Sequence, residues 1–349
     1  MKLLLLVLLL GMLLSASRQY PTIGKVVRID NRINALLPEN AQLEVLASGF
    51  EWAEGPVWVK ANGDEPGYLL FSDVPQNTIF RWDEKAGLKP FLKPSGYTGR
   101  GTYSNEPGSN GLTIDPQGRL IACEHGDRRV SAMPLGKPGV QPGSGKITLA
   151  DRCDGKRFNS PNDVVAHANG SYYFTDPPYG LPKQENDPTR ETPLFGVYRI
   201  APNGQVSVVI SDLVRPNGVA LSPDQNTLYV AQSDGQQPVI MAYPIQADGN
   251  VGKGRLVYNA SALMKQGLKG APDGLKVDEQ GNIWSTGPGG VLVIATDPNG
   301  GVGTLLGRID PGEATANCAW GDDGKTLYLT ADMYLCRIKT NVRGAGWER

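Results

Sequence analysis

Short apolar runs alternate with tight polar turns along most of the chain, and one unit of this pattern is repeated. In its clearest copy, residues 271–284, Asp273 leads a first, mostly apolar run, and a glycine-containing turn connects it to a second run that includes Trp284. Short apolar runs bounded by polar turns are typical of β-strands. The pattern therefore predicts pairs of neighbouring strands, and no stretch predicts a long amphipathic helix.

Six copies of the unit follow one another, and their first residues are 44 to 56 positions apart. Each copy opens with a polar residue, in order Glu54, Asn110, Asn162, Asn217, Asp273 and Asn317. Repeats of about 40–50 residues with several strands each are typical of propeller blades. We therefore expect an all-β protein, a six-bladed β-propeller whose six polar lead residues meet at one end of the central channel.

The two ends of the chain suggest how the ring closes. The last unit, residues 317–339, supplies only about three strands, and an alternating strand at 42–46 precedes the first unit without a blade of its own. We expect this N-terminal strand to complete the last blade and remove its open edge. The predicted organisation is a lead-in at 18–40, one propeller domain at 41–340 and a tail at 341–349.

The first residues look like an export signal. Lys2 is followed by an apolar run at 3–14 and by small residues at 15–17. This run is too short to span a bilayer, and the basic start with a small-residue exit is typical of a cleaved signal peptide. We predict a signal peptide at 1–17 and an exported protein, periplasmic in a Gram-negative cell and otherwise secreted, without a membrane partner after cleavage. An uncleaved anchor is the alternative.

Composition narrows the possible partners. The chain has 34 basic and 35 acidic residues without a long run of either sign, which argues against a nucleic-acid partner. Only two histidines are present, and the spacing of the four cysteines fits no zinc motif. Cys318 and Cys336 are a conceivable disulfide in one blade, although three pairings remain possible.

The lead residues suggest a metal site. All six carry oxygen donors, and two of them, Glu54 and Asp273, are acidic. Calcium takes six to eight oxygen ligands in loose geometry, and two negative charges balance a divalent ion. The alternative is that Asn and Asp at strand starts merely cap turns. Six polar leads in register favour the metal site.

Four motifs, in order and spacing, resemble those of the gluconolactonase / senescence-marker / luciferin-regenerating family. They are Glu-Gly-Pro-Val-Trp at 54–58, Ser-Pro-Asn-Asp at 160–163, Pro-Asn-Gly at 216–218 and Pro-Asp-Gly at 272–274. The likeness covers about residues 41–340, and the tract at 125–130 is similar to the bacterial gluconolactonase-like branch. The resemblance implies a six-bladed hydrolase with Ca²⁺, or another divalent cation, held by Glu54, Asn162, Asn217 and Asp273.

The resemblance also implies that Asp273 is the general base that activates water for attack on a lactone. His125 is a second candidate for the base, because its ordinary pKa suits base work near neutrality and its strand is expected to end at the channel mouth. With Asp273 as base, we expect His125 to contact the substrate instead. Asn110, Arg157, Asp176 and Tyr179 are candidates for contacting the substrate. Two long segments, 94–107 and 177–193, exceed what a blade needs.

These observations predict a calcium-dependent hydrolase that opens a sugar lactone at the channel mouth, with a small molecule as partner. One alternative keeps the metal site and changes the substrate to another lactone, an ester or a phosphotriester. The other is a propeller that binds a partner without catalysis, which would not need acidic residues inside its channel.

Overall fold

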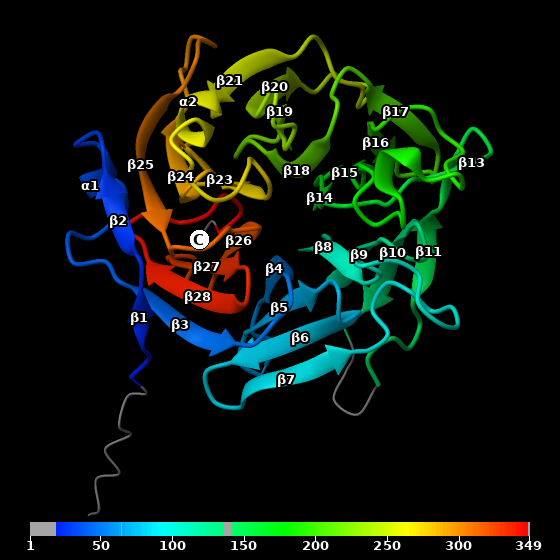
Figure 1. Cartoon of the computed structure of the whole chain (residues 1–349), viewed down its shortest axis with the longest axis horizontal. Helices are drawn as coiled ribbons and strands as arrows, with labels where there is room; N and C mark the ends of the chain where they lie inside the picture. The colour runs from blue at the N-terminus through cyan, green and yellow to red at the C-terminus, as the bar shows by residue number, and fades with distance from the viewer. Residues whose placement is uncertain (1–18, 64, 136–140, 348–349) are drawn as a thin grey trace, which may run out of the picture.

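The strands form six sheets arranged as a ring around a central channel (Figure 1). The computed structural model describes residues 19–63, 65–135 and 141–347, so the predicted signal peptide lies outside the described residues. The innermost strand of each sheet contacts that of the next, from β4 around to β26 and back to β4. The prediction of a six-bladed β-propeller is confirmed.

Each blade is an antiparallel sheet whose strands follow one another along the chain. Blade one contains β4 (Ala53–Val59), β5 (Tyr68–Asp73), β6 (Thr78–Asp83) and β7 (Gly87–Leu92). Blade two contains β8 (Ser109–Ile114), β9 (Arg119–Glu124), β10 (Arg129–Pro134) and β11 (Ile147–Ala150). Blade three contains β14 (Val164–Ala166), β15 (Tyr172–Thr175), β16 (Val197–Ile200) and β17 (Val206–Ile210). A small hairpin, β12 (Arg152–Cys153) with β13 (Lys156–Arg157), precedes blade three.

The remaining three blades complete the ring. Blade four contains β18 (Pro216–Leu221), β19 (Thr227–Gln232), β20 (Val239–Pro244) and β21 (Arg255–Asn259). Blade five contains β22 (Leu275–Val277), β23 (Ile283–Gly287), β24 (Gly290–Ala295) and β25 (Thr304–Asp310). Blade six contains β26 (Asn317–Gly321), β27 (Thr326–Ala331) and β28 (Tyr334–Lys339). Among the described residues, helices are limited to single turns, at α1 (Ile33–Leu36), α2 (Ser261–Met264) and the 3₁₀ turn η1 (Gln184–Asn186).

The ring closes as the sequence predicts, by an N-terminal strand. β3 (Leu43–Ser48) pairs antiparallel with β28 and supplies the fourth strand of blade six. β1 (Thr22–Ile23) then pairs with β3, and β2 (Lys25–Arg28) adds a fifth strand to blade five by pairing with β25. The segment that the sequence shows as a lead-in thus covers the outer edges of two blades, which protects them from pairing with other chains.

Apolar side chains fill the space between neighbouring blades. At the closure, Phe71 and Trp82 of blade one pack with Tyr328 and Leu335 of blade six in one buried cluster. Trp58 stacks on Tyr328 across the same junction, with ring centroids 5.5 Å apart. Burial of such aromatic surface stabilises the contact between the first and last blades.

Glycines behind the lead residues let the innermost strands come close together. A Cβ on Gly55 would lie 2.1 Å from the carbonyl oxygen of Asn110, and one on Gly218 would lie 2.1 Å from that of Asp273. The pairing of β18 with β19 also shifts register between Pro216 and Val219, and β4 and β8 have similar irregularities after their first residues. Such bulges change the direction in which a side chain points. Each of these bulges lies at the lead residue of its strand, at the end of the channel.

We expect Gly218→Ala to lower the free energy of unfolding by about 1–3 kcal/mol, the usual cost of forcing an extra group into a well-packed interior. Gly235→Ala is the matched control, because a Cβ there meets nothing within 4 Å. Urea denaturation of the two variants and the parent protein measures the difference. Equal stability of both variants would show that the blades can separate without cost at this point.

The four cysteines are free thiols. Cys318 on β26 and Cys336 on β28 both flank Leu329 of β27, so two strand spacings separate them. That is about 9.5 Å, and a disulfide requires Cα atoms within about 7 Å. The conceivable Cys318–Cys336 pair is therefore excluded by the strand order. Within the part of the chain that the structure describes, no helix is long and apolar enough to cross a membrane.

Candidate functional site

A cavity of about 380 Å³ lies where the innermost strands of the blades begin. Five of the six lead residues line it, namely Glu54, Asn110, Asn162, Asn217 and Asp273. The sixth, Asn317, donates from Nδ2 to Oε2 of Glu54 at 3.2 Å. The structure thus brings all six lead residues together at one end of the channel, as their register in the repeats predicts.

Two carboxyl groups in this cavity are strongly perturbed. Burial raises the pKa of Glu54 to about 8, against the hydrogen bond that Oε2 accepts from the Gly55 amide at 2.8 Å. Burial, and then repulsion by Glu54, Asp163 and Glu106, raises the pKa of Asp273 well above its ordinary value. A bound cation would offset both effects by pairing the charges that burial disfavours.

The carboxamides leave one oxygen without a partner. Asn162 donates from Nδ2 to Oδ1 of Asn217 at 2.7 Å, and Asn217 donates from Nδ2 to the Ser233 hydroxyl at 2.8 Å. Oδ1 of Asn162 is buried and accepts no hydrogen bond from any described residue. A buried, unsatisfied oxygen is costly. This oxygen belongs to the same cavity as the carboxyl groups of Glu54 and Asp273, which is the arrangement expected of ligands for a hard cation.

The donor set fits calcium better than a transition metal. Among the described residues, no group of three or more histidine, cysteine, aspartate or glutamate side chains is close enough to hold a metal ion. The predicted ligand set contains only two such side chains, Glu54 and Asp273, and its other donors are carboxamides. Oxygen donors without sulfur or imidazole suit Ca²⁺ or Mg²⁺.

The structure adds side chains that the repeat pattern does not indicate. Glu106, from the long segment at 94–107, lines the cavity, and burial raises its pKa to about 7. Arg215 also lines it, forms an ion pair with Glu185 and lies 5.9 Å from the ring centroid of Tyr179. The signal that pointed toward Glu106 was the unusual length of its loop.

Residues 52–332 match the family described as SMP-30/Gluconolactonase/LRE-like region. The chain belongs to this family. A gluconolactonase of Zymomonas mobilis subsp. mobilis is 39% identical over 330 residues, which cover 93% of this chain and 88% of the relative.

Two further relatives place the chain within the family. A solved gluconolactonase structure from Xanthomonas campestris has a TM-score of 0.74 and 28% identity, covering 93% of this chain and 99% of the other. A regucalcin from Oryctolagus cuniculus is 25% identical and covers 86% of each chain. The resemblance found in the four motifs thus extends over nearly the whole chain.

Of the predicted substrate contacts in this gluconolactonase-family propeller, Asn110 and Tyr179 line the cavity. Asp176 does not. Its buried carboxylate accepts hydrogen bonds from the amides of Asn159 and Ser160, at 2.7 and 2.8 Å, and so fixes the loop that carries Asn162. Arg157 lines a different cavity, because the β12–β13 hairpin carries it away from the channel axis.

His125 lies behind the cavity rather than on it. Its side chain is fully buried, Nδ1 lies 3.2 Å from the Glu106 carbonyl oxygen, and a Cβ on Gly180 would lie 2.4 Å from the histidine Cβ. Burial lowers the pKa of His125 to about 4, against the hydrogen bond with the Glu106 carbonyl oxygen. The imidazole is therefore neutral near pH 7, and because it does not line the cavity, the geometry favours support of the ligand loop over substrate contact or water activation.

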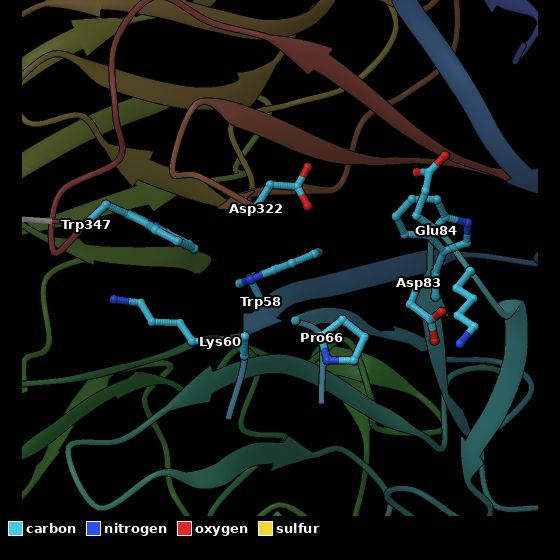
Figure 2. Close-up of a pocket in the computed structure, with 11 residues that line it drawn as sticks. Trp58, Lys60, Pro66, Asp83, Glu84, Asp322 and Trp347 are labelled. Atoms are coloured by element: carbon cyan, nitrogen blue, oxygen red, sulfur yellow. The ribbon is translucent and has the colours of Figure 1, made fainter. Parts of the chain in front are cut away.

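A larger cavity, of about 710 Å³, lies at the opposite end of the blades. Figure 2 shows Trp58 and Trp347 in its wall, together with charged side chains at or just beyond strand ends, Lys60, Asp83, Glu84 and Asp322. Both acidic and basic side chains line this cavity, and none of the six lead residues does. The smaller cavity is the candidate active site because it gathers the perturbed carboxylates.

Proposed function

We propose that this protein is a calcium-dependent hydrolase that opens a sugar lactone at the channel mouth. Glu54, Asn162, Asn217 and Asp273 would hold the cation. The observation that carries the proposal is the convergence of two buried carboxylates and an unpartnered Asn162 oxygen in one oxygen-lined cavity. The names of the Zymomonas and Xanthomonas relatives support the lactone as substrate.

A bound divalent cation would supply a Lewis acid that polarises the lactone carbonyl. The residues of the chain do the remaining work. In this proposal Asp273 accepts a proton from water at the carboxylate oxygen that does not hold the cation. Pairing with the cation would offset the effect of burial and keep this carboxylate ionised, and therefore able to accept the proton. The hydroxide portion of that water bonds to the carbonyl carbon, the ring C–O bond breaks, and the ring oxygen takes up a proton. The product is an open hydroxy acid.

Other groups shape the site for a small polar substrate. The Tyr179 hydroxyl is buried without a hydrogen-bond partner among the described residues, and burial raises its pKa to about 12, so it stays protonated and able to donate. Asn110 adds a carboxamide. Buried donors without partners favour substrates that carry hydroxyl groups, because only those satisfy them.

A panel of lactones in a pH-indicator assay, run with and without a chelator, tests the proposal. We expect acid release from five- and six-membered sugar lactones, its loss after chelation and its return with added Ca²⁺. Turnover of simple esters or phosphotriesters in preference to lactones would assign the site a different substrate. No turnover of any substrate, together with no response to calcium, would favour a binding propeller. The export of the protein remains a prediction from residues 1–17.

A further inference from the structure

The cavity that Arg157 lines is at the same end of the propeller as the candidate active site. It has a volume of about 540 Å³ and is lined in part by Tyr97, Tyr103, Asp127, Arg128, Arg129 and Arg157. Tyr103 belongs to the loop that also supplies Glu106 to the active-site cavity, and Arg128 is in the turn between β9 and β10, three residues after His125. The two cavities thus share the 94–107 loop.

Arg128 is buried in the wall of this cavity without an acidic partner. Its side chain belongs to a residue only 3% exposed, Nε donates to the Phe158 carbonyl oxygen at 2.7 Å, and Nη1 donates to the Thr189 carbonyl oxygen at 3.0 Å. Nη2 is buried and has no partner among the described residues. A buried cation whose N–H groups meet only neutral acceptors is unfavourable. Burial lowers the pKa of Arg128, although the Asp176 and Glu191 carboxylates attract it from beyond ion-pair distance.

The same cavity contains a second buried hydrogen-bond donor that has no partner among the described residues. The Tyr103 hydroxyl makes no hydrogen bond within the described part of the chain, although its ring is stacked on Tyr97 with centroids 5.0 Å apart. Two positive charges, Arg128 and Arg157, act on this hydroxyl, together with the carboxylate of Asp187. One cavity therefore contains two unsatisfied donors and a further guanidinium.

The acidic groups at the cavity do not supply the missing acceptor. The Asp127 carboxylate accepts from the Thr98 amide at 3.0 Å and from the Thr98 hydroxyl at 2.8 Å, and it pairs with Arg129 at 3.2 Å. Asp151 is half-exposed and its nearest ion-pair contact is Arg152, at 3.8 Å. Donors therefore outnumber available acceptors, which is the condition for binding an external anion.

We propose that this cavity is a binding site for an oxyanion, a carboxylate or a phosphate, held by Arg128 Nη2, the Tyr103 hydroxyl and Arg157. The anion is either free or carried on a substrate that extends from the channel mouth. The second case rests on the proposed lactone hydrolysis; the first does not. Guanidinium groups recognise both oxyanions well, because their planar N–H donors match the spacing of two oxygens.

Tyr103→Phe is the sharpest test, because it removes a hydroxyl that makes no contact within the described chain. The variant should fold as stably as the parent. Sulfate, which remains soluble with calcium and represents a tetrahedral oxyanion, and acetate are titrated by calorimetry against the full-length protein at constant ionic strength. We expect saturable binding to the parent, weakened about tenfold by Tyr103→Phe, the loss typical of one hydrogen bond to a charged group.

Tyr243→Phe is the matched control, because the Tyr243 hydroxyl in β20 is likewise buried but lies in blade four, outside this cavity. It should leave the affinity unchanged. Arg157→Gln should also weaken binding. No saturable binding of either anion, or equal weakening by both tyrosine variants, would overturn the proposal.

A kinetic comparison distinguishes the source of the anion. If the substrate carries it, a lactone with a free carboxylate or a phosphate ester should have a lower KM than a neutral lactone, and Tyr103→Phe should remove that advantage without changing kcat for the neutral lactone. If sulfate or acetate binds and the KM values are equal, the occupant is a free anion. Because the titration does not require turnover, failure of the lactonase proposal would leave this test intact.

Discussion

Replacing Asp273 with asparagine should abolish lactone turnover even at saturating Ca²⁺, whereas Glu54→Gln should mainly weaken cation binding. Both variants remove one negative charge from the proposed ligand set. Only Asp273→Asn also removes the proposed proton acceptor. Loss of a general base typically lowers kcat by about 10²–10⁴-fold, and the simultaneous loss of a ligand should increase the effect. Added calcium should restore part of the activity of Glu54→Gln and little of that of Asp273→Asn.

Steady-state kinetics over a range of calcium concentrations measure this difference, and calorimetry gives the cation affinity separately. Asp224→Asn is a suitable control, since its carboxylate accepts hydrogen bonds only within an exposed turn before β19. It should behave as the parent protein. If calcium rescues Glu54→Gln and Asp273→Asn equally, Asp273 is only a ligand and another group accepts the proton.

Without a cation, the free energy of unfolding should fall as the pH rises from about 6.5 to about 8. Glu54 has an ordinary pKa of 4.5 and a folded pKa of about 8, so in this window the native state holds a proton that the unfolded state has released. Stability decreases with pH wherever the native state binds more protons. Asp273 contributes in the same direction.

His125 contributes with the opposite sign, but at lower pH. Its folded pKa of about 4 lies below the ordinary 6.5, so the unfolded state binds the extra proton between these values and stability rises there with pH. Above about 6.5 the imidazole is neutral in both states. The window from 6.5 to 8 therefore isolates the carboxyl groups.

Bound calcium should reverse the pH dependence of the free energy of unfolding between pH 6.5 and 8. Below about pH 8, binding must release the proton held on Glu54, so calcium affinity, and with it the stabilisation of the native state, should increase with pH. Urea unfolding at pH 6.5 and 8, each with excess chelator and with excess Ca²⁺, gives the four free energies required. Glu54→Gln should reduce the pH dependence of the cation-free protein without abolishing it, because Asp273, Glu106 and Asp176 also have raised pKa values. Cation-free stability that rises from pH 6.5 to 8 would contradict the electrostatic account of the cavity.

Much of the architecture could be predicted from local patterns. Strand pairs, their polar lead residues and their spacing are all encoded within a few positions, because strand formation and tight turns depend on near neighbours in the chain. The closing strand β3 was predictable because blade six lacked a strand. The pairing of β2 with β25 was not, because a four-residue strand at a covered edge carries no repeat signal.

The residues of the candidate site likewise fall into two groups, those that the sequence predicts and those that only the tertiary structure reveals. The sequence by itself determined that Glu54, Asn162, Asn217 and Asp273 lie in equivalent positions of four of the six blades, and the symmetry of a closed ring brings equivalent positions together. Only the tertiary structure decided that Glu106 enters the cavity, that Asp176 holds a loop and that His125 is buried and neutral. These side chains come from connecting loops and strand ends, whose paths and burial depend on packing between blades, and no local pattern records that packing.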